Sequence, residues 1–164
     1  MRPASVVISL ILVTTACGPT ASNPPEAPQL TEEYGCGFGF YLGNVDQTAG
    51  LFIALSDFDV GQSGDVPESS SLSDDIWRSQ LQFGADLFAN WCDDVIEPGE
   101  PEPEITETWN VSGTIEILEL PEPGTCGPAR ALLADVEAHS PDDDEVLALG
   151  DFDAENGFWG CFAG

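Results

Sequence analysis

The stretch DFDVGQSGDVPE, residues 57–68, carries carboxylates at the spacing of a calcium-binding loop. Positions 1, 3, 9 and 12 of such a loop hold oxygen ligands, and here they are Asp57, Asp59, Asp65 and Glu68. The stretch has glycine at position 5, where an oxygen ligand is usual, and glutamine at position 6, where the sharp turn needs glycine. It is therefore a candidate calcium site, and the competing interpretation is a solvated acidic turn.

Residues suited to catalysis are sparse. His139 is the only histidine and lies next to Ser140, but adjacency in sequence does not make a nucleophile and base, and no oxyanion-loop motif accompanies them. The chain has no glycine-rich phosphate loop, and paired carboxylates carry no information where acids are so common. We therefore predict that the protein is not an enzyme. An unrecognised secreted hydrolase is the third functional hypothesis.

Aromatic side chains offer binding chemistry instead, because flat rings pack against the apolar faces of sugars. The candidates are Trp77, Trp91, Trp109, Trp159, Tyr34 and Tyr41. Trp91 and Trp109 fall at alternating positions that predict inward-facing core residues, whereas Trp77 follows a polar stretch and is the candidate for ligand stacking. The second functional hypothesis is accordingly a calcium-dependent ligand-binding or carbohydrate-binding module, with calcium as the one cofactor considered.

The charge of the chain excludes whole classes of partner. It has 30 acidic residues against three arginines and no lysine, for a formal net charge of −27. Nucleic acid is excluded as a partner, because binding a polyanion needs a basic surface. Peripheral attachment to anionic lipid headgroups is excluded for the same reason. The partner that the sequence leaves open is a protein or a glycan of unknown identity.

Strand patterns dominate the part of the chain that must position these residues. Apolar residues alternate with polar ones from residue 80 to 91 and again from 109 to 117, and turn sequences separate several shorter apolar runs. Residues 128–139 suit either a helix or a strand, and the strand is favoured slightly because apolar residues alternate there too. We predict an all-β, antiparallel β-sandwich or small barrel in a single domain over residues 34–164.

Four cysteines, Cys36, Cys92, Cys126 and Cys161, suit two disulfides in an exported domain. Four cysteines allow three pairings, which spacing alone does not distinguish. A weak internal similarity joins IALSDFD at 53–59 and LALGDFD at 147–153, and coincidence is the favoured explanation; a duplication, the alternative, would favour the pairs Cys36–Cys92 and Cys126–Cys161. We favour Cys36–Cys161 and Cys92–Cys126 instead, because first and last strands of sandwiches often lie side by side.

The fifth cysteine, Cys17, follows a short apolar run and precedes a proline-rich stretch. The run is too short to span a bilayer, and residues 1–16 are typical of a secretory signal peptide. The sequence Thr14-Thr15-Ala16-Cys17 resembles the lipobox of bacterial lipoprotein precursors, with threonine where leucine is commonest. The resemblance implies cleavage before Cys17 and lipidation of its sulfur.

These features together predict where the protein works. Residues 17–33 would tether the domain to a membrane through the lipid, on the extracytoplasmic side of the cell envelope. The first functional hypothesis is a cell-envelope lipoprotein with a non-catalytic structural or interaction role at the cell surface.

Overall fold

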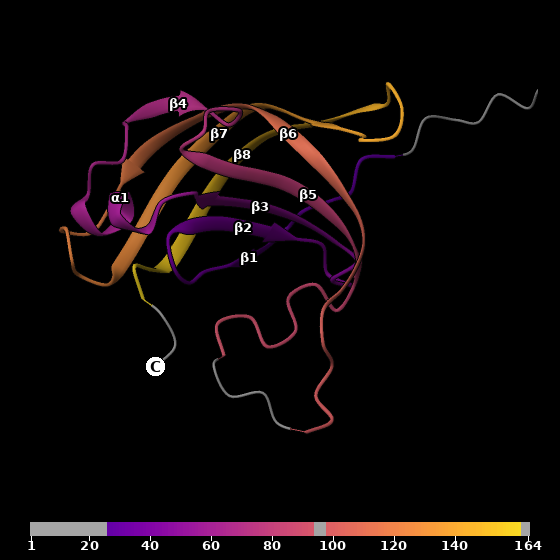
Figure 1. The fold of residues 1–164 in the computed structure, drawn as a ribbon, viewed down its shortest axis with the longest axis horizontal. Coiled ribbons are helices and arrows are strands. Elements are labelled where there is room, and N and C mark those ends of the chain that lie inside the picture. The colour runs from indigo at the N-terminus through magenta and orange to yellow at the C-terminus, as the bar shows by residue number, and fades with distance from the viewer. Residues whose placement is uncertain (1–25, 94–97, 162–164) are drawn as a thin grey trace, which may run out of the picture.

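The computed structural model describes residues 26–93 and 98–161. In chain order the elements are β1 (Glu32–Tyr34), β2 (Gly39–Gly43), β3 (Ala49–Leu55), α1 (Phe58–Ser63), β4 (Ser69–Ser71), β5 (Trp77–Ala85), β6 (Glu104–Glu119), β7 (Gly127–His139) and β8 (Val146–Trp159) (Figure 1). Within these ranges, no helix has the length and apolar character needed to cross a membrane. The predicted signal peptide 1–16, Cys17 and the tether up to residue 25 lie outside the described residues.

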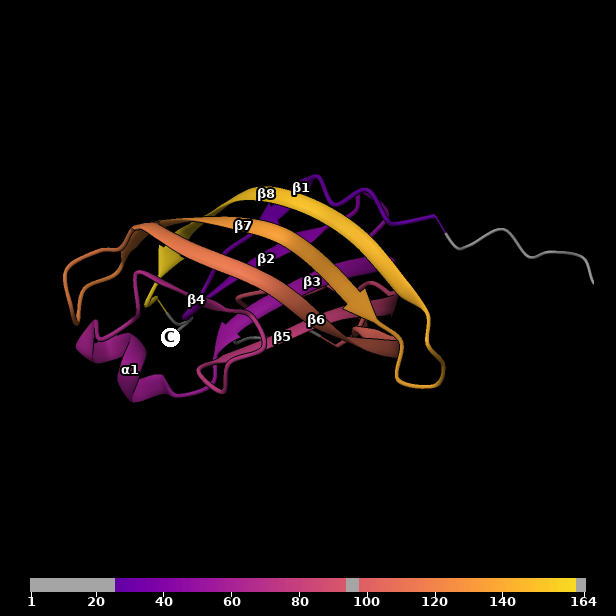
Figure 2. The ribbon, with the colours of Figure 1, turned by 90° about the horizontal axis from the view of Figure 1, so that it is seen from above.

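The strands form one antiparallel sheet whose order follows the chain. That order is β1-β2-β3-β5-β6-β7-β8, and the short β4 pairs with β6 beyond the end of β5. The sheet curls so that its last strand, β8, lies beside its first strands, and the long strands β6, β7 and β8 arch over β2, β3 and β5 (Figure 2). The all-β prediction is confirmed, in the form of a nearly closed barrel rather than a sandwich.

Alternating side chains fill the barrel interior. Side chains that are at most 1% exposed come from β2, β3, β5, β6, β7 and β8, and they include Phe40, Leu51, Ile53, Leu81, Ile115, Leu133, Val136 and Ala154. Burying a side chain as large as leucine contributes about 1.5 to 3 kcal/mol to stability. On β7 the inward positions include Ala129, Ala131 and Ala138. Residues 128–139 are therefore a strand, as favoured from the sequence.

A buried asparagine on β8 closes the seam of the barrel. Asn156 is 0% exposed, and its Nδ2 donates to the carbonyl of Gly39 at 2.7 Å and to that of Gly37 at 3.3 Å. Its Oδ1 accepts from the backbone N–H of Phe158 at 2.8 Å. The backbone at Gly35 packs directly against Asn156, and a Cβ at this position would collide with the asparagine side chain. Glycine at position 35 therefore permits the close approach. The side chain thus supplies hydrogen bonds where no regular ladder joins β2 to β8.

The disulfides differ from the pairing favoured from the sequence. The bonds are Cys36–Cys92 and Cys126–Cys161, so the favoured Cys36–Cys161 and Cys92–Cys126 pairing is wrong. The physical reason lies in how the barrel closes. The chain around Cys36 does lie beside Cys161, but the contact is a backbone hydrogen bond from the Gly37 N–H to the Cys161 carbonyl. The Cys36 side chain instead points to the β5–β6 connection, where it bonds to Cys92. All four cysteines form disulfides, as predicted.

Two boundaries also differ from the predictions. The alternation expected to continue to residue 91 ends with β5 at Ala85, because Asp86 adopts a positive φ of 51° and the chain turns out of the sheet. At the other end, the fold begins before residue 34: Leu30 is buried in the core and residues 32–34 form β1. The last residues assigned to the tether are therefore part of the barrel.

Candidate functional site

The outer faces of β2 and β3 are covered by aromatic residues rather than by solvent. Tyr41 of β2 and Phe52 of β3 point away from the barrel interior, since Phe40 and Ile53 point into it. The start of the β5–β6 connection folds back over them and brings Leu87, Phe88 and Trp91 into contact, which forms a second apolar cluster outside the barrel. We call this set the outer aromatic cluster: Tyr34, Tyr41, Phe52, Leu87, Phe88 and Trp91.

Phe88 lies at the centre of the outer aromatic cluster. Its ring stacks on Tyr34 with centroids 3.8 Å apart and on Phe52 with centroids 5.0 Å apart. The ring rests over Gly43 and Gly50, which face each other on β2 and β3, and a Cβ at either glycine would come within 2.5 to 2.8 Å of it. The two glycines therefore make the shallow seat that this ring occupies.

Residues 86–93, at the start of the β5–β6 connection, lie over β2 and β3, and we call them the covering segment. The Cys36–Cys92 disulfide holds this segment in place. Trp91, directly before Cys92, meets Tyr41 edge-on with ring centroids 4.7 Å apart. Its indole N–H is buried and has no hydrogen-bond partner among the described residues. A covalent bond here fixes residues 86–93, which belong to no strand, so the aromatic rings keep their positions.

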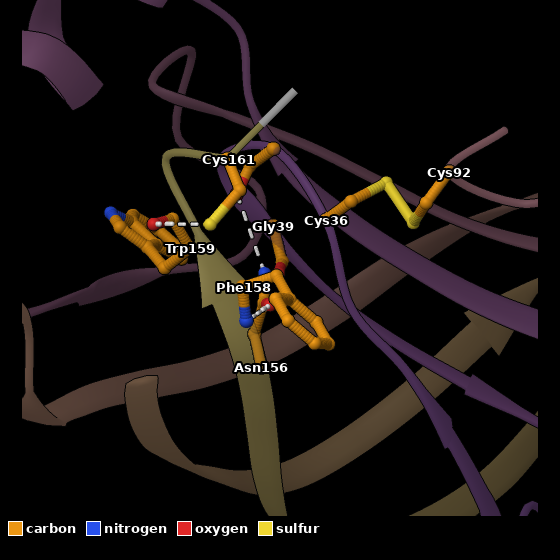
Figure 3. Close-up of a disulfide and its surroundings, with 8 residues drawn as sticks. Cys36, Gly39, Cys92, Asn156, Phe158, Trp159 and Cys161 are labelled. Atoms are coloured by element: carbon orange, nitrogen blue, oxygen red, sulfur yellow. Dashed lines mark hydrogen bonds between the residues drawn. A yellow bond between two sulfur atoms is a disulfide. The ribbon is translucent and has the colours of Figure 1, made fainter. Parts of the chain in front are cut away.

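A pocket of about 670 Å³ opens beside this cluster. It lies between the chain around β1, the covering segment and the end of β8, and its wall includes Tyr34, Phe88, Trp91 and Phe158. Phe158 is 63% exposed, and it lies with Asn156 near the Cys36–Cys92 disulfide (Figure 3). The volume is in the range of small-molecule sites, and a mostly apolar wall with a few polar groups is typical of them. We call it the aromatic pocket.

Two acids, Glu33 and Asp93, line the aromatic pocket. One N–H of the Asn90 amide donates to the carbonyl of Pro101 at 2.9 Å. Burial raises the pKa of Glu33, and the nearby carboxylates of Glu155 and Asp153 raise it further. Burial also raises the pKa of the Tyr34 phenol. The pocket therefore disfavours anions and suits groups that donate hydrogen bonds.

Burial of Tyr41 in the outer aromatic cluster predicts alkaline sensitivity. Burial raises the pKa of its phenol to about 12. The folded state then favours the neutral phenol, so this contribution to stability is complete below pH 10 and is lost as the pH rises towards 12. At pH 11 it amounts to a loss of about 1 kcal/mol relative to pH 9. Urea unfolding at both pH values should show this loss in the wild type and not in Tyr41→Phe; equal losses in the two proteins would contradict the assignment.

The structure does not gather the predicted calcium ligands. Asp57 caps the N-terminus of α1, where its Oδ1 accepts from the Asp59 backbone N–H at 2.9 Å. A short helix over residues 58–63 replaces the curved loop that calcium needs, and Asp65 and Glu68 lie in the exposed chain beyond it. In the described ranges, no group of three or more His, Cys, Asp or Glu side chains is placed to hold a metal ion.

The structure places the predicted stacking residue in the core. Trp77 is 5% exposed, and its Nε1 donates to the Ser70 hydroxyl at 2.7 Å. A ring this deeply buried offers no flat face to a sugar. Trp109 and Trp159 are also core residues, at 5% and 2% exposed, so Trp91 is the half-buried tryptophan of the four.

His139 has a different partner from the one next to it in sequence. Its Nε2 lies 2.8 Å from the hydroxyl of Ser112 on β6. Asn110 is directly opposite His139 across β6 and β7, and Ser112 is two residues further along β6. The pair therefore arises from strand register, which adjacency to Ser140 did not reveal.

Phe88 and Phe158 are pocket residues that the sequence analysis missed. The alternation from residue 80 to 91 places Phe88 among the polar, outward-facing positions of the expected strand, although the preceding Gly84-Ala85-Asp86 contains residues that favour a strand end and a turn. Phe158 belongs to the closing GFWGCFAG run, which gave no sign of which aromatic side chain points outward.

Comparison with known proteins finds no matching family model, no similar curated protein and no similar solved structure. Functional inference therefore depends on the residues of this chain.

Proposed function

We propose that this chain is a cell-envelope lipoprotein whose barrel is a non-catalytic binding module at the cell surface. The observation that carries the proposal is the aromatic pocket: a disulfide-fixed connection builds it on the outside of a barrel whose interior is already filled. The two disulfides are consistent with an oxidising, extracytoplasmic setting.

A neutral saccharide is the ligand class best suited to this pocket. The rings of Tyr34 and Phe158 supply faces or edges for sugar C–H groups, and the Glu33 carboxyl supplies an acceptor for hydroxyl groups. The net charge of −27 opposes anionic polymers. Calcium has no part in this proposal, since the candidate ligands are not brought together.

Titration of the full chain with neutral trisaccharides tests the binding proposal. Trp91 lies in the pocket wall while the other tryptophans are buried in the core, so a saturable change in tryptophan emission would report on the pocket. We expect Phe158→Ala to weaken binding about tenfold, which corresponds to the loss of one aromatic contact. Val45→Ala, at a residue 72% exposed and outside the pocket wall, should bind like the wild type.

Two outcomes would count against saccharide binding. One is the absence of saturable binding to trisaccharides of glucose or N-acetylglucosamine while the protein remains folded. The other is equal weakening by Phe158→Ala and Val45→Ala.

The lipid anchor has a separate test. Mass spectrometry of the N-terminal peptide of the envelope protein should find that the chain begins at Cys17 and that its sulfur carries diacylglycerol. An unmodified Cys17, or a chain that begins beyond it, would remove the anchor from the proposal and leave the binding module to its own test.

A further inference from the structure

A second pocket lies where two strands part along β6. β5 pairs with β6 as far as Gln80 opposite Asn110, and β4 takes over from Ser71 opposite Thr114. A hollow of about 540 Å³ opens at this fork, and none of its lining residues is shared with the aromatic pocket. We call it the fork pocket.

The fork pocket differs in charge from the rest of this acidic protein. The chain has 30 acidic residues, but none of those in the described ranges lines the pocket. Its polar lining residues on the outer face of the sheet are Arg78, Gln80, Asn110, Ser112 and His139. The strand register puts Gln80, Asn110 and His139 in one row across β5, β6 and β7. Glu137 on β7 lies opposite Ser112 in the strand register, and its carboxylate is the nearest one along these paired strands. Glu137 is not among the residues that line the fork pocket.

Arg78 is the cation available at this pocket. The other arginine of the described ranges, Arg130, is bound to Asp153 at 2.9 Å and to Glu155 at 3.0 Å. No ion pair within the part of the chain that the structure describes involves Arg78. Arginine presents a planar fork of N–H donors that matches the two oxygens of a carboxylate.

The neighbouring side chains add hydrogen-bond donors. Ser112 and His139 share one hydrogen bond, so either the serine hydroxyl or the second ring nitrogen keeps a proton to donate to a ligand. The side-chain Oε1 of Gln80 accepts a hydrogen bond from Nε2 of Gln82 at 3.2 Å. The side-chain N–H groups of Gln80 therefore remain as donors for a ligand. The Ser79 hydroxyl, also in the pocket lining, is buried without a hydrogen-bond partner among the described residues.

We propose that the fork pocket binds a small organic monocarboxylate, with Arg78 on the carboxylate and the Ser112–His139 pair as an additional donor. Leu72, Trp77 and Val111 also line the pocket, but each is at most 5% exposed, so they add only a small apolar area beside the polar groups. A single guanidinium balances one negative charge, whereas a phosphate would bring a second charge into a strongly negative protein. This inference is independent of the function proposed for the aromatic pocket.

The only histidine of the chain provides the readout. The ring signals of His139 in NMR spectra of the full chain, prepared without a histidine tag, are unambiguous. Titration with benzoate should shift them saturably at millimolar concentration, and benzamide, a neutral compound of the same shape, should not. Inorganic phosphate is the third probe and should bind at least tenfold more weakly than benzoate.

Two arginine variants are matched in charge. Arg78→Gln and Arg130→Gln each remove one positive charge, but only Arg78 lines the fork pocket. We expect Arg78→Gln to weaken benzoate binding tenfold or more and Arg130→Gln to change it less than twofold. Glu137→Gln removes the nearest carboxylate in register and should tighten benzoate binding.

Several outcomes would overturn the inference. They are the absence of saturable His139 shifts with benzoate, equal shifts with benzamide, tighter binding of phosphate than of benzoate, or equal weakening by the two arginine variants. Because none of these readouts involves saccharide binding, failure here and failure of the proposed function are distinguishable.

Discussion

Replacing Cys36 and Cys92 together by serine is expected to lower the free energy of unfolding by about 4 kcal/mol. The bond joins residues 56 apart in sequence, and the loss of loop-closure entropy from the unfolded chain gives a stabilisation of this size. The variant should also release the covering segment from β2 and β3, because residues 86–93 belong to no strand. Urea unfolding measures the first effect, and a red shift of Trp91 emission in the folded state reports the second.

The second disulfide is the matched control for this prediction. The Cys126–Cys161 bond joins residues 35 apart, so its removal should cost a similar free energy of about 4 kcal/mol. It does not hold the covering segment, and Trp91 emission should therefore stay unchanged. If both double variants shift the emission equally, the Cys36–Cys92 bond does not have the specific role assigned to it here.

Replacing Asn156 by alanine is expected to cost about 3 kcal/mol of stability. The substitution removes three hydrogen bonds at the barrel seam and leaves the buried Gly39 carbonyl and the partly buried Phe158 N–H without this partner. The exposed Asn110 lies on the outer face of β6, where an alanine should change stability by less than about 0.5 kcal/mol. Urea unfolding of both variants measures the contrast, and a loss below 1 kcal/mol for Asn156→Ala would show that other contacts close the barrel.

The fold class was predictable because strand alternation is a local property. The β6 pattern around Trp109 and Val111 appears in the barrel. On β7 the predicted alternation holds for Val136 and Ala138 but not for Leu132, which is 39% exposed, because the register shifts after Leu133. The calcium-loop spacing at 57–68 was also local, but the same acids suit a helix cap, and Asp57 takes that role. A pattern of carboxylates in an acidic chain does not distinguish these uses.

The disulfide pairing and the pockets depend on distant contacts. Whether Cys36 meets Cys92 or Cys161 is decided by how the two ends of the sheet meet, which no single segment encodes. The correct pairing is the one suggested by the internal similarity, yet the similar segments are not equivalent in the fold. IALSDFD crosses from β3 into α1, whereas LALGDFD lies within β8. The agreement of the pairing with that suggestion is therefore not evidence of a duplication.

The two pockets differ in charge although they belong to one acidic barrel. Glu33 and Asp93 line the aromatic pocket, whereas the described residues that line the fork pocket include Arg78 and no acid. This contrast leads to different expected ligands, a neutral saccharide for the first and a monocarboxylate for the second. Neither site could be predicted from composition, because the net charge of −27 averages over both.

The most direct test of the central proposal follows the indole N–H of Trp91 by NMR during titration of the full chain with a neutral trisaccharide. The proposal predicts that the Trp91 signal shifts saturably, while those of the core residues Trp77, Trp109 and Trp159 stay in place. If the Trp91 signal stays fixed at ligand concentrations of tens of millimolar, the aromatic pocket is not a saccharide site and the proposed binding function is contradicted.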